Sequence, residues 1–440
     1  MVGLDSALDR RTVLKGMLGG AAGLTTVGSL GACSSSGSGS ADQLTFWHLF
    51  SGADGANVSQ MQANVEQRNP GLDVQATTLA WGSPYYTKLA MASVGGRPPD
   101  AAALHVSRLS GYAPGGLLVP YDLTHLASLG ITEQSVSPAL WKRCLYQGQL
   151  YSLPLDTHPF VAFYNLDIAE KAGMVATDGS ITPITSTDQF LEAGTKMAEV
   201  TGKAGISYGY VLDPAQAWRL FWGLYGQTGG KYSFETGQSA QWDTDKAAQV
   251  ITFITKMLDG KITPKTLDYP GAISYFTAGA TGMILSGVWE TPSFKKAIPH
   301  LAATPMPTLF GTPANYADSH SFVLPTRFAQ DDARLARTYE LVTGLVKQGL
   351  VWAQGGHIPA YLSATKEQAY LDLKPQSQYA AAAESVFLDP PVWFSGAGSD
   401  FQNQMSTRLQ QAFMGQVTPA QCAISMLDTI TTMLKIPNPA

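Results

Sequence analysis

The segment LTFWHLFSGADGANVSQMQANVEQRNPGLDVQATTLA, residues 44–80, decides the fold class. Its first residues predict a strand over 44–50, and a helix is expected over about 55–68. The Asn-Pro-Gly sequence at 69–71 ends that helix, and a second strand is expected over 72–80. A strand, a helix and a strand in this order are typical of a parallel sheet with crossover helices, so the segment predicts an α/β fold.

The same alternation continues along the chain. A second helix is expected over 84–94 and a third strand over 100–104, which completes a β-α-β-α-β unit. A further α/β stretch is predicted, with a strand at 160–164 and helices at 166–173, 187–200, 214–228 and 244–258. Ligands of parallel sheets bind beyond the carboxyl ends of the strands. The residues at the three N-terminal strand ends are His48, Ser51, Trp81, His105 and Ser107.

Few charges and many aromatic side chains characterise the composition. Of 440 residues, 28 are Lys or Arg and 33 are Asp or Glu, so charged residues make up 14%, well below the roughly 25% of an average soluble protein. The 9 Trp, 18 Tyr and 17 Phe give 44 aromatic residues. A net charge of -5 without a Lys/Arg-rich run argues against a nucleic-acid partner, because phosphate contacts need clustered cations. The length predicts about two to three domains.

The N-terminus has the features of an export signal. Arg10 and Arg11 precede an apolar, glycine-rich run at 17–32 that is shorter than the roughly 20 residues needed to span a bilayer. We therefore expect residues 1–32 to be an export signal of the twin-arginine type. Asp9 stands where a Ser or Thr is usual, which leaves an ordinary secretory signal as the alternative.

A lipid-attachment site follows the signal. The sequence LGAC at 30–33 resembles the lipobox of bacterial lipoproteins, in which the cysteine is acylated, so Cys33 is expected to carry the lipid. Residues 33–41 are mostly Ser and Gly and predict a flexible tether. The expected location is the extracytoplasmic face of a bacterial membrane. Cys144 and Cys422 lie far apart in the sequence and indicate neither a disulfide framework nor a zinc site.

Four short motifs occur in order along the body of the chain. They are LTFWH at 44–48, PDAA at 99–102, GQLYSLP at 148–154 with Tyr-Asn at 164–165, and FTAGATGM at 276–283. In this order, over about 44–435, they resemble the extracellular solute-binding proteins of family 1, which serve ATP-driven carbohydrate importers. The resemblance implies a periplasmic-binding-protein-like fold of two α/β lobes with a hinge and an interlobe cleft. It places 42–153 and 309–347 in lobe 1, and 154–308 and 348–440 in lobe 2.

A serine motif raises the possibility of a hydrolase. Residues 205–209, GISYG, fit the G-x-S-x-G pattern of a nucleophile elbow, which needs a strand before the serine and a helix after it. Large apolar side chains alternate from Ile206 to Leu212, so we expect one strand running to Asp213 instead. On the helix expected next, Trp218, Phe221, Trp222 and Tyr225 share one face. That face is either core or the wall of a cleft.

Two carboxylates, Asp156 and Glu290, suit either catalysis or binding. A glycosidase would use such a pair across the scissile bond. A binding protein would use them to accept hydrogen bonds from sugar hydroxyls. For Glu290 there is also a structural alternative, as an acid in the first turn of a helix that begins near 291–292. The family resemblance favours binding.

Aromatic side chains in loop-like contexts suit the apolar face of a sugar ring. Trp81, Trp289 and Trp393 lie among Gly, Pro or Ser neighbours, where an indole can stack on a ring whose edge hydroxyls need polar partners. Trp289 is the strongest of the three candidates, and ordinary packing is the alternative for the others. Tyr85 is expected to join them, since either Tyr85 or Tyr86 should face the cleft at the start of the helix.

Histidine is concentrated in the motif-like segments. The resemblance implies ligand contacts for His105, His158 and His320, whereas His357 is expected to brace its lobe. No two of these histidines have the i, i+4 spacing of a helical metal site, and neutral imidazole suits hydroxyl groups equally well. We therefore expect no metal ligands and no cofactor.

The segments around these candidates contain one cation, Arg108, whereas anionic ligands normally recruit Arg or Lys. The sequence thus predicts a neutral di- or oligosaccharide ligand. The functional hypothesis is a monomeric, lipid-anchored binding component that delivers sugar to the permease of an ATP-driven importer and catalyses no reaction. Two alternatives remain, a secreted glycoside hydrolase that uses Asp156 and Glu290, and a cell-surface interaction protein without a small ligand.

Overall fold

The computed structural model describes residues 43–329 and 331–438, which belong to one compact unit, Ala41–Ala440. The predicted signal at 1–32 and the tether at 33–41, with its lipid site at Cys33, lie outside the described residues. Within the described ranges, no helix is long and apolar enough to cross a bilayer.

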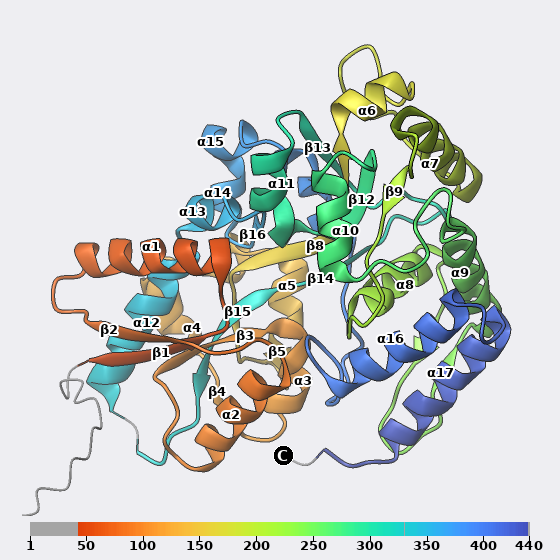
Figure 1. Ribbon diagram of the computed structural model, residues 1–440. Helices are drawn as coiled ribbons and strands as arrows, with labels where there is room; N and C mark the ends of the chain where they lie inside the picture. The colour runs from red at the N-terminus through yellow and green to blue at the C-terminus, as the bar shows by residue number, and fades with distance from the viewer. Residues whose placement is uncertain (1–42, 330, 439–440) are drawn as a thin grey trace, which may run out of the picture. The chain divides into compact units, whose positions relative to one another are not determined.

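The first sheet confirms the α/β prediction. Its strand order is β2-β1-β3-β15-β4, and β7 pairs with β15. The strands are β1 (Leu44–His48), β2 (Val74–Thr78), β3 (Ala101–His105), β4 (Leu118–Val119), β7 (Leu153–Pro154) and β15 (His320–Pro325). β1 is parallel to β2 and to β3, whereas β15 runs antiparallel to β3. The crossover helices α1 (Gly52–Arg68) and α2 (Ser83–Val94) lie on opposite faces of these strands (Figure 1).

The core of this sheet follows from its apolar spacing. On α1 the buried residues are Val58, Met61 and Val65, which recur at helical intervals and face the sheet. The strand β3 is buried along its whole length, as expected for a central strand covered on both faces. Other helices of this region are α3 (Leu109–Tyr112), α4 (Leu123–Ser128), α5 (Pro138–Arg143), α12 (Asp332–Val346) and α13 (Gly349–Ala353). The hairpin β5 (Leu145–Tyr146) and β6 (Gln149–Leu150) stands apart from the sheet.

A second sheet is organised around one long strand, β8 (Asp156–Asn165). Its order is β17-β14-β8-β12-β9, with β13 and β16 also paired to β8. The remaining strands are β9 (Ile206–Ser207), β12 (Met283–Gly287), β13 (Leu301–Pro305), β14 (Asn315–Asp318), β16 (Ile358–Pro359) and β17 (Val386–Phe387). β8 is buried at nine of its ten positions, which places it at the centre of this half of the molecule.

The chain passes between the two sheets three times: twice through a single residue, and once from β15 to β16 through α12 and α13. β7 of the first sheet ends at Pro154 and β8 of the second begins at Asp156, so Leu155 is the connection. β14 of the second sheet ends at Asp318 and β15 of the first begins at His320, so Ser319 is the other connection. The two connections are neighbours, since Leu155 N donates to His320 O at 2.8 Å.

Helices cover the second sheet and enclose an aromatic core. The longer ones are α7 (Thr187–Thr201), α8 (Gln216–Gln227), α9 (Thr244–Met257), α16 (Asp400–Phe413) and α17 (Pro419–Leu434). Shorter helices are α6 (Leu166–Lys171), α10 (Tyr269–Thr277), α11 (Thr291–Ala297), α14 (Leu362–Lys366) and α15 (Gln368–Leu371), and β10 (Tyr232–Ser233) pairs with β11 (Gln241–Trp242). The aromatic face of α8 is fully buried at Trp218, Phe221, Trp222 and Tyr225. That face is therefore core, which decides between the two alternatives left open by the sequence.

The strand expected from Ile206 to Asp213 is wrong beyond Ser207. Tyr210 N and Val211 N donate to Leu267 O instead of extending a strand ladder, and Leu212 has a φ of 57° with 89% of its surface exposed. The alternating apolar residues resemble a strand because Tyr208 and Tyr210 both pack into the core. Their backbone, however, forms no strand ladder beyond Ser207. The next helix begins at Gln216, two residues later than the expected start at 214, and the Asp213 carboxylate accepts hydrogen bonds from Ala215 N and Gln216 N at this point.

The G-x-S-x-G motif has a packing role. Ser207 is fully buried, and its hydroxyl lies 2.7 Å from that of Thr281, so it is no exposed nucleophile. Both flanking glycines make close backbone contacts. A Cβ at Gly205 would lie 1.8 Å from Gly194 O of α7, and one at Gly209 would lie 2.4 Å from Asp268 O.

Gly205→Ala should therefore destabilise the fold without touching any pocket. The added methyl group cannot fit against a helix backbone, and overpacking of this kind costs about 1–3 kcal/mol. Urea unfolding followed by circular dichroism measures the change. An unfolding midpoint equal to that of the wild type would contradict the assigned helix contact.

Candidate functional site

A cavity of about 500 Å³ lies where the strand ends of both sheets meet. Its walls are the loop after β1, the ends of β3 and β15, the start of β8, the start of α8, and the turn between β12 and α11. Its lining residues are Leu49, Phe50, Ser51, Gly52, Ala53, Asp54, Trp81, His105, His158, Asp213, Pro214, Ala215, Gln216, Arg219, Tyr269, Trp289, Glu290, Pro292, Ser293 and His320. The cavity thus lies at carboxyl ends of the parallel strands, where the sequence placed the ligand.

The structure brings together six of the nine residues that the sequence nominated for ligand binding. Those that line the cavity are Trp81, His105, His158, Trp289, Glu290 and His320. Three lie elsewhere. Tyr85 is buried and donates to Ala103 O, Asp156 is buried behind the histidines, and Trp393 packs on the core near α16 with its indole donating to Ile436 O.

Trp289 and Glu290 are held by a shared phenol. The Tyr269 hydroxyl donates to Glu290 Oε1 at 2.8 Å and accepts from Trp289 Nε1 at 2.8 Å. A Cβ at Gly287 would lie 2.0 Å from the Trp289 ring, so the glycine at the end of β12 gives the indole its place. The Arg219 guanidinium lies 4.9 Å from the centre of that ring. Trp289 is therefore fixed in orientation before any ligand arrives.

Glu290 does not act as a helix cap. It stands at the N-cap position of α11, yet its side chain makes no capping hydrogen bond and turns to Tyr269 instead. Burial raises the pKa of Glu290, an effect that the hydrogen bond from Tyr269 partly offsets. Glu290 thus has the position at the start of α11 that the structural alternative predicted, while its hydrogen bond goes to Tyr269 in the cavity lining.

Asp156 is the centre of the polar network under the cavity. Five nitrogen atoms surround its carboxylate at 2.6–3.1 Å: His158 Nδ1, His320 N, His320 Nδ1, Trp352 Nε1 and His357 Nδ1. Burial alone would raise the pKa of Asp156, but the surrounding histidines hold it well below its usual range. The carboxylate is thus an anion with no exposed surface.

His357 links this network to α1. Its Nε2 lies 3.0 Å from Asp54 Oδ1, and its Nδ1 lies 3.1 Å from Asp156 Oδ2. Burial would lower the pKa of His357, but the two carboxylates raise it to about 10. His357 is therefore a buried cation between two anions, and it is absent from the cavity lining.

Sequence reasoning missed a cation in the cavity. Arg219 lines it one turn inside α8, and burial would lower its pKa, but Tyr316 and Asp213 raise it. The cavity therefore contains a cation, contrary to the expectation on which the prediction of a neutral ligand was based. The available signal was the position of Arg219 in the first turn of the helix that follows Asp213, a segment whose residues Asp213 and Gln216 also line the cavity. Nothing comparable in the sequence indicated that Tyr269 and Asp54 line the cavity.

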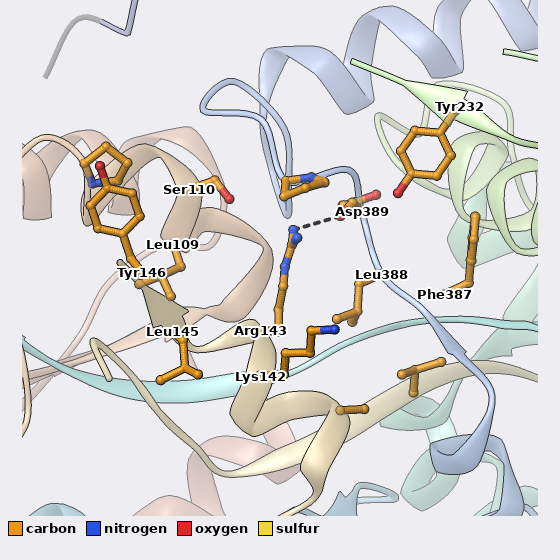
Figure 2. A pocket seen from close by; sticks show the side chains of 14 residues that line it. Leu109, Ser110, Lys142, Arg143, Leu145, Tyr146, Tyr232, Phe387, Leu388 and Asp389 are labelled. Atoms are coloured by element: carbon orange, nitrogen blue, oxygen red, sulfur yellow. Dashed lines mark hydrogen bonds between the residues drawn. The ribbon is translucent and has the colours of Figure 1, made fainter. Parts of the chain in front are cut away.

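A second cavity, of about 620 Å³, lies between α3, α5 and the segment 386–391. Figure 2 shows Arg143 there, with its guanidinium directed at Asp389, whose backbone oxygen accepts a hydrogen bond at 2.8 Å. Although this cavity is larger, it contains none of the nominated residues and no cluster of histidines. We therefore assign the candidate site to the cavity around Trp289.

Comparison with known protein families shows to which family the chain belongs. The family model described as bacterial extracellular solute-binding protein matches residues 50–333 of the chain. The chain belongs to this family. An arabinooligosaccharide-binding protein of Bacillus subtilis is 25% identical over 290 residues, which is 62% of this chain and 62% of that protein. A maltodextrin-binding protein of the same species is 22% identical over 49% of each chain. The aligned part thus falls short of two thirds of these relatives' lengths.

Solved structures show the same fold. The GacH receptor of Streptomyces glaucescens, determined unliganded and with acarbose, superposes with a TM-score of 0.74 at 19% identity over 89% of this chain and 98% of that one. The maltose-maltodextrin binding protein of Alicyclobacillus acidocaldarius superposes with a TM-score of 0.68 at 19% identity, over 88% and 99% of the two chains. The predicted periplasmic-binding-protein-like architecture is therefore confirmed for this solute-binding protein.

Tyr269→Phe should raise the pKa of Glu290. The phenol hydrogen bond favours the ionised carboxylate, so its removal leaves burial and the Asp54 charge, which both raise the pKa, without an opposing effect. Carbon-detected NMR titration of labelled glutamate carboxyls measures the shift. Tyr275→Phe, on the same helix, is the matched control and should leave the titration unchanged. An unchanged pKa in Tyr269→Phe would contradict the assigned hydrogen bond.

Proposed function

We propose that this chain is the ligand-binding component of an ATP-driven importer and that it binds an oligosaccharide in the cavity of about 500 Å³. The observation that carries the proposal is the pairing of aromatic and polar groups on its walls. Trp81 and Trp289 offer apolar faces, while Glu290, Arg219 and the histidines offer hydrogen-bonding groups beside them. A sugar ring needs both kinds of contact at once.

Names of relatives support the ligand class. One relative is named for arabino-oligosaccharides and another for maltodextrins, and the receptor from Streptomyces glaucescens was solved with acarbose. All three ligands are short chains of linked rings. An elongated ligand suits a cavity whose two tryptophans come from separate elements, the loop before α2 and the turn before α11.

The proposed mechanism is closure of two lobes around the sugar. Lobe 1 comprises 42–153 and 309–347, and lobe 2 comprises 154–308 and 348–440. Strand pairing favours Leu155 and Ser319 as the crossing residues, which moves the segment 309–318 into lobe 2 because β14 pairs with β8. Hinges need only a few residues that change backbone angles. Cavity residues come from both sides of these crossings, so closure would bury the ligand.

The proposal includes attachment to the extracytoplasmic face of the membrane. The supporting observations are the twin arginines at 10–11 and the lipobox ending at Cys33. A lipid on Cys33 and the serine-glycine tether would hold a monomeric body near the permease. No covalent chemistry is proposed, because Asp156 has no exposed surface from which to attack or protonate a sugar opposite Glu290.

A sugar panel tests this function. Thermal unfolding of the soluble body should shift upward with arabino-oligosaccharides or maltodextrins, and a ligand at about 100 times its Kd should stabilise by roughly 2.7 kcal/mol. Chromatography of the same mixtures should show the sugars unchanged. Shortened sugars would select the hydrolase alternative, and the absence of any shift across the panel would contradict a sugar-binding protein.

Trp289→Ala should weaken binding of whichever sugar gives the shift. Loss of a central aromatic contact costs about 2 kcal/mol, which corresponds to roughly a 30-fold higher Kd. Isothermal titration calorimetry measures the change. Trp393→Ala is the matched control, since this tryptophan lies outside the cavity lining and should leave the Kd unaltered. Equal effects of both substitutions would contradict the assigned site.

A further inference from the structure

The second cavity, of about 620 Å³, has the size of a site for a small molecule, since ligand pockets measure about 300–1,000 Å³. Its lining comes from both sides of the molecule. The helices α3 and α5 and the strand β5 contribute from the side of the first sheet, and β10, β17 and residues 388–391 from the side of the second. The proposed function gives this cavity no role.

Two neighbouring cations reach into the cavity from the last turn of α5. Figure 2 shows Lys142 and Arg143 directed toward the segment 386–391. Arg143 Nη2 donates to Asp389 O at 2.8 Å, which orients the guanidinium but uses only one of its N–H groups. Within the described ranges, neither cation forms an ion pair with a carboxylate. The lining therefore has two cations without an anionic partner.

The acidic residue of this lining has its carboxylate turned away. Asp389 Oδ1 accepts from Trp218 Nε1 at 2.7 Å, and Oδ2 accepts from Gln402 Nε2 at 3.0 Å and from the Tyr316 hydroxyl at 3.3 Å. Asp389 is only 1% exposed. Its charge thus belongs to the core of the second half of the molecule, and the cavity meets its backbone oxygen instead.

The position of Arg143 is unfavourable for a cation. Burial lowers the pKa of the guanidinium, and the charges of Asp318 and Asp389 offset this effect only in part. A charged group removed from water needs hydrogen-bonding partners to replace its hydration. A carboxylate or a phosphate group meets this need, because either accepts two parallel N–H bonds from one guanidinium.

We propose that this cavity is a binding site for a small organic anion, whose carboxylate or phosphate group pairs with Lys142 and Arg143. The hydroxyls of Ser110 and Tyr232 are on the same lining and have no hydrogen-bond partner among the residues that the structure describes. They are available to donate to the remaining oxygens of the anion. The site goes beyond the proposed function and does not require it.

The rest of the lining fits an apolar body behind the anionic group. Most of the other side chains are apolar, among them Leu109, Leu145 and Phe387, and Tyr146 adds an aromatic ring. Burial of apolar surface contributes about 25 cal/mol per Å². Inorganic phosphate would leave this surface uncovered, so we expect the ligand to have a ring or a short hydrocarbon chain.

Calorimetric titration with sodium benzoate and with phenyl phosphate tests the proposal, because each probe joins an anionic group to an aromatic ring. We expect one saturable site per chain for at least one of them, with an affinity that falls as sodium chloride is added. Benzamide, which has the shape of benzoate without its charge, should bind at least about 10-fold more weakly than the better anion. The proposal would be overturned if neither anion gave saturable binding, or if benzamide bound equally well.

Substitutions locate the site with the better of the two anions. Arg143→Gln and Lys142→Gln should each weaken its binding by about 10-fold. Lys142→Gln keeps the test decisive if loss of the Arg143 hydrogen bond impairs folding, because Lys142 is exposed. Lys203→Gln is the matched control, since this exposed lysine lines neither cavity and its loss should change nothing. Binding that survives both α5 substitutions but is lost in Arg219→Gln would place the anion in the other cavity and contradict the proposal.

Discussion

The buried carboxylate of Asp156 is the interaction on which the site depends. It lies at the first residue of the central strand of the second sheet and accepts hydrogen bonds from His320 of the first sheet. A buried anion is tolerated only when donors replace its lost hydration, and here four nitrogens donate hydrogen bonds while His357 adds an ion pair. The same bonds orient the rings of His158 and His320, which line the cavity. The Asp156 carboxylate therefore connects the two sheets to each other and to the cavity wall.

Rigid placement extends from this centre to the rest of the cavity. His357 connects Asp156 to Asp54 at the start of α1, and Tyr269 fixes Trp289 and Glu290 on the other side. Groups that are already oriented lose less conformational entropy on binding, which favours affinity. The cavity therefore combines fixed aromatic faces with fixed polar atoms, as the recognition of a sugar requires.

The sequence predicted the fold well but only part of the site. Apolar periodicity and the turn at 69–71 were enough for the parallel strands β1, β2 and β3, since these signals are local. The alternation of apolar residues after Ile206 led to a wrong strand prediction. Tyr208 and Tyr210 are buried at the two-residue interval of a strand, but the strand ladder ends at Ser207. Strand register is set by partners far apart in the chain, so no local pattern could show that His105 and His320 lie opposite each other.

Hydrogen–deuterium exchange with and without a saturating oligosaccharide tests the central assignment most directly. Our account predicts protection in the cavity segments 49–54, 213–219 and 288–293. The second cavity, around Arg143 and Asp389, serves as an internal reference that should be unaffected at its own lining residues. Protection at 386–391 without protection at 288–293 would contradict the assignment of the sugar site to the cavity around Trp289.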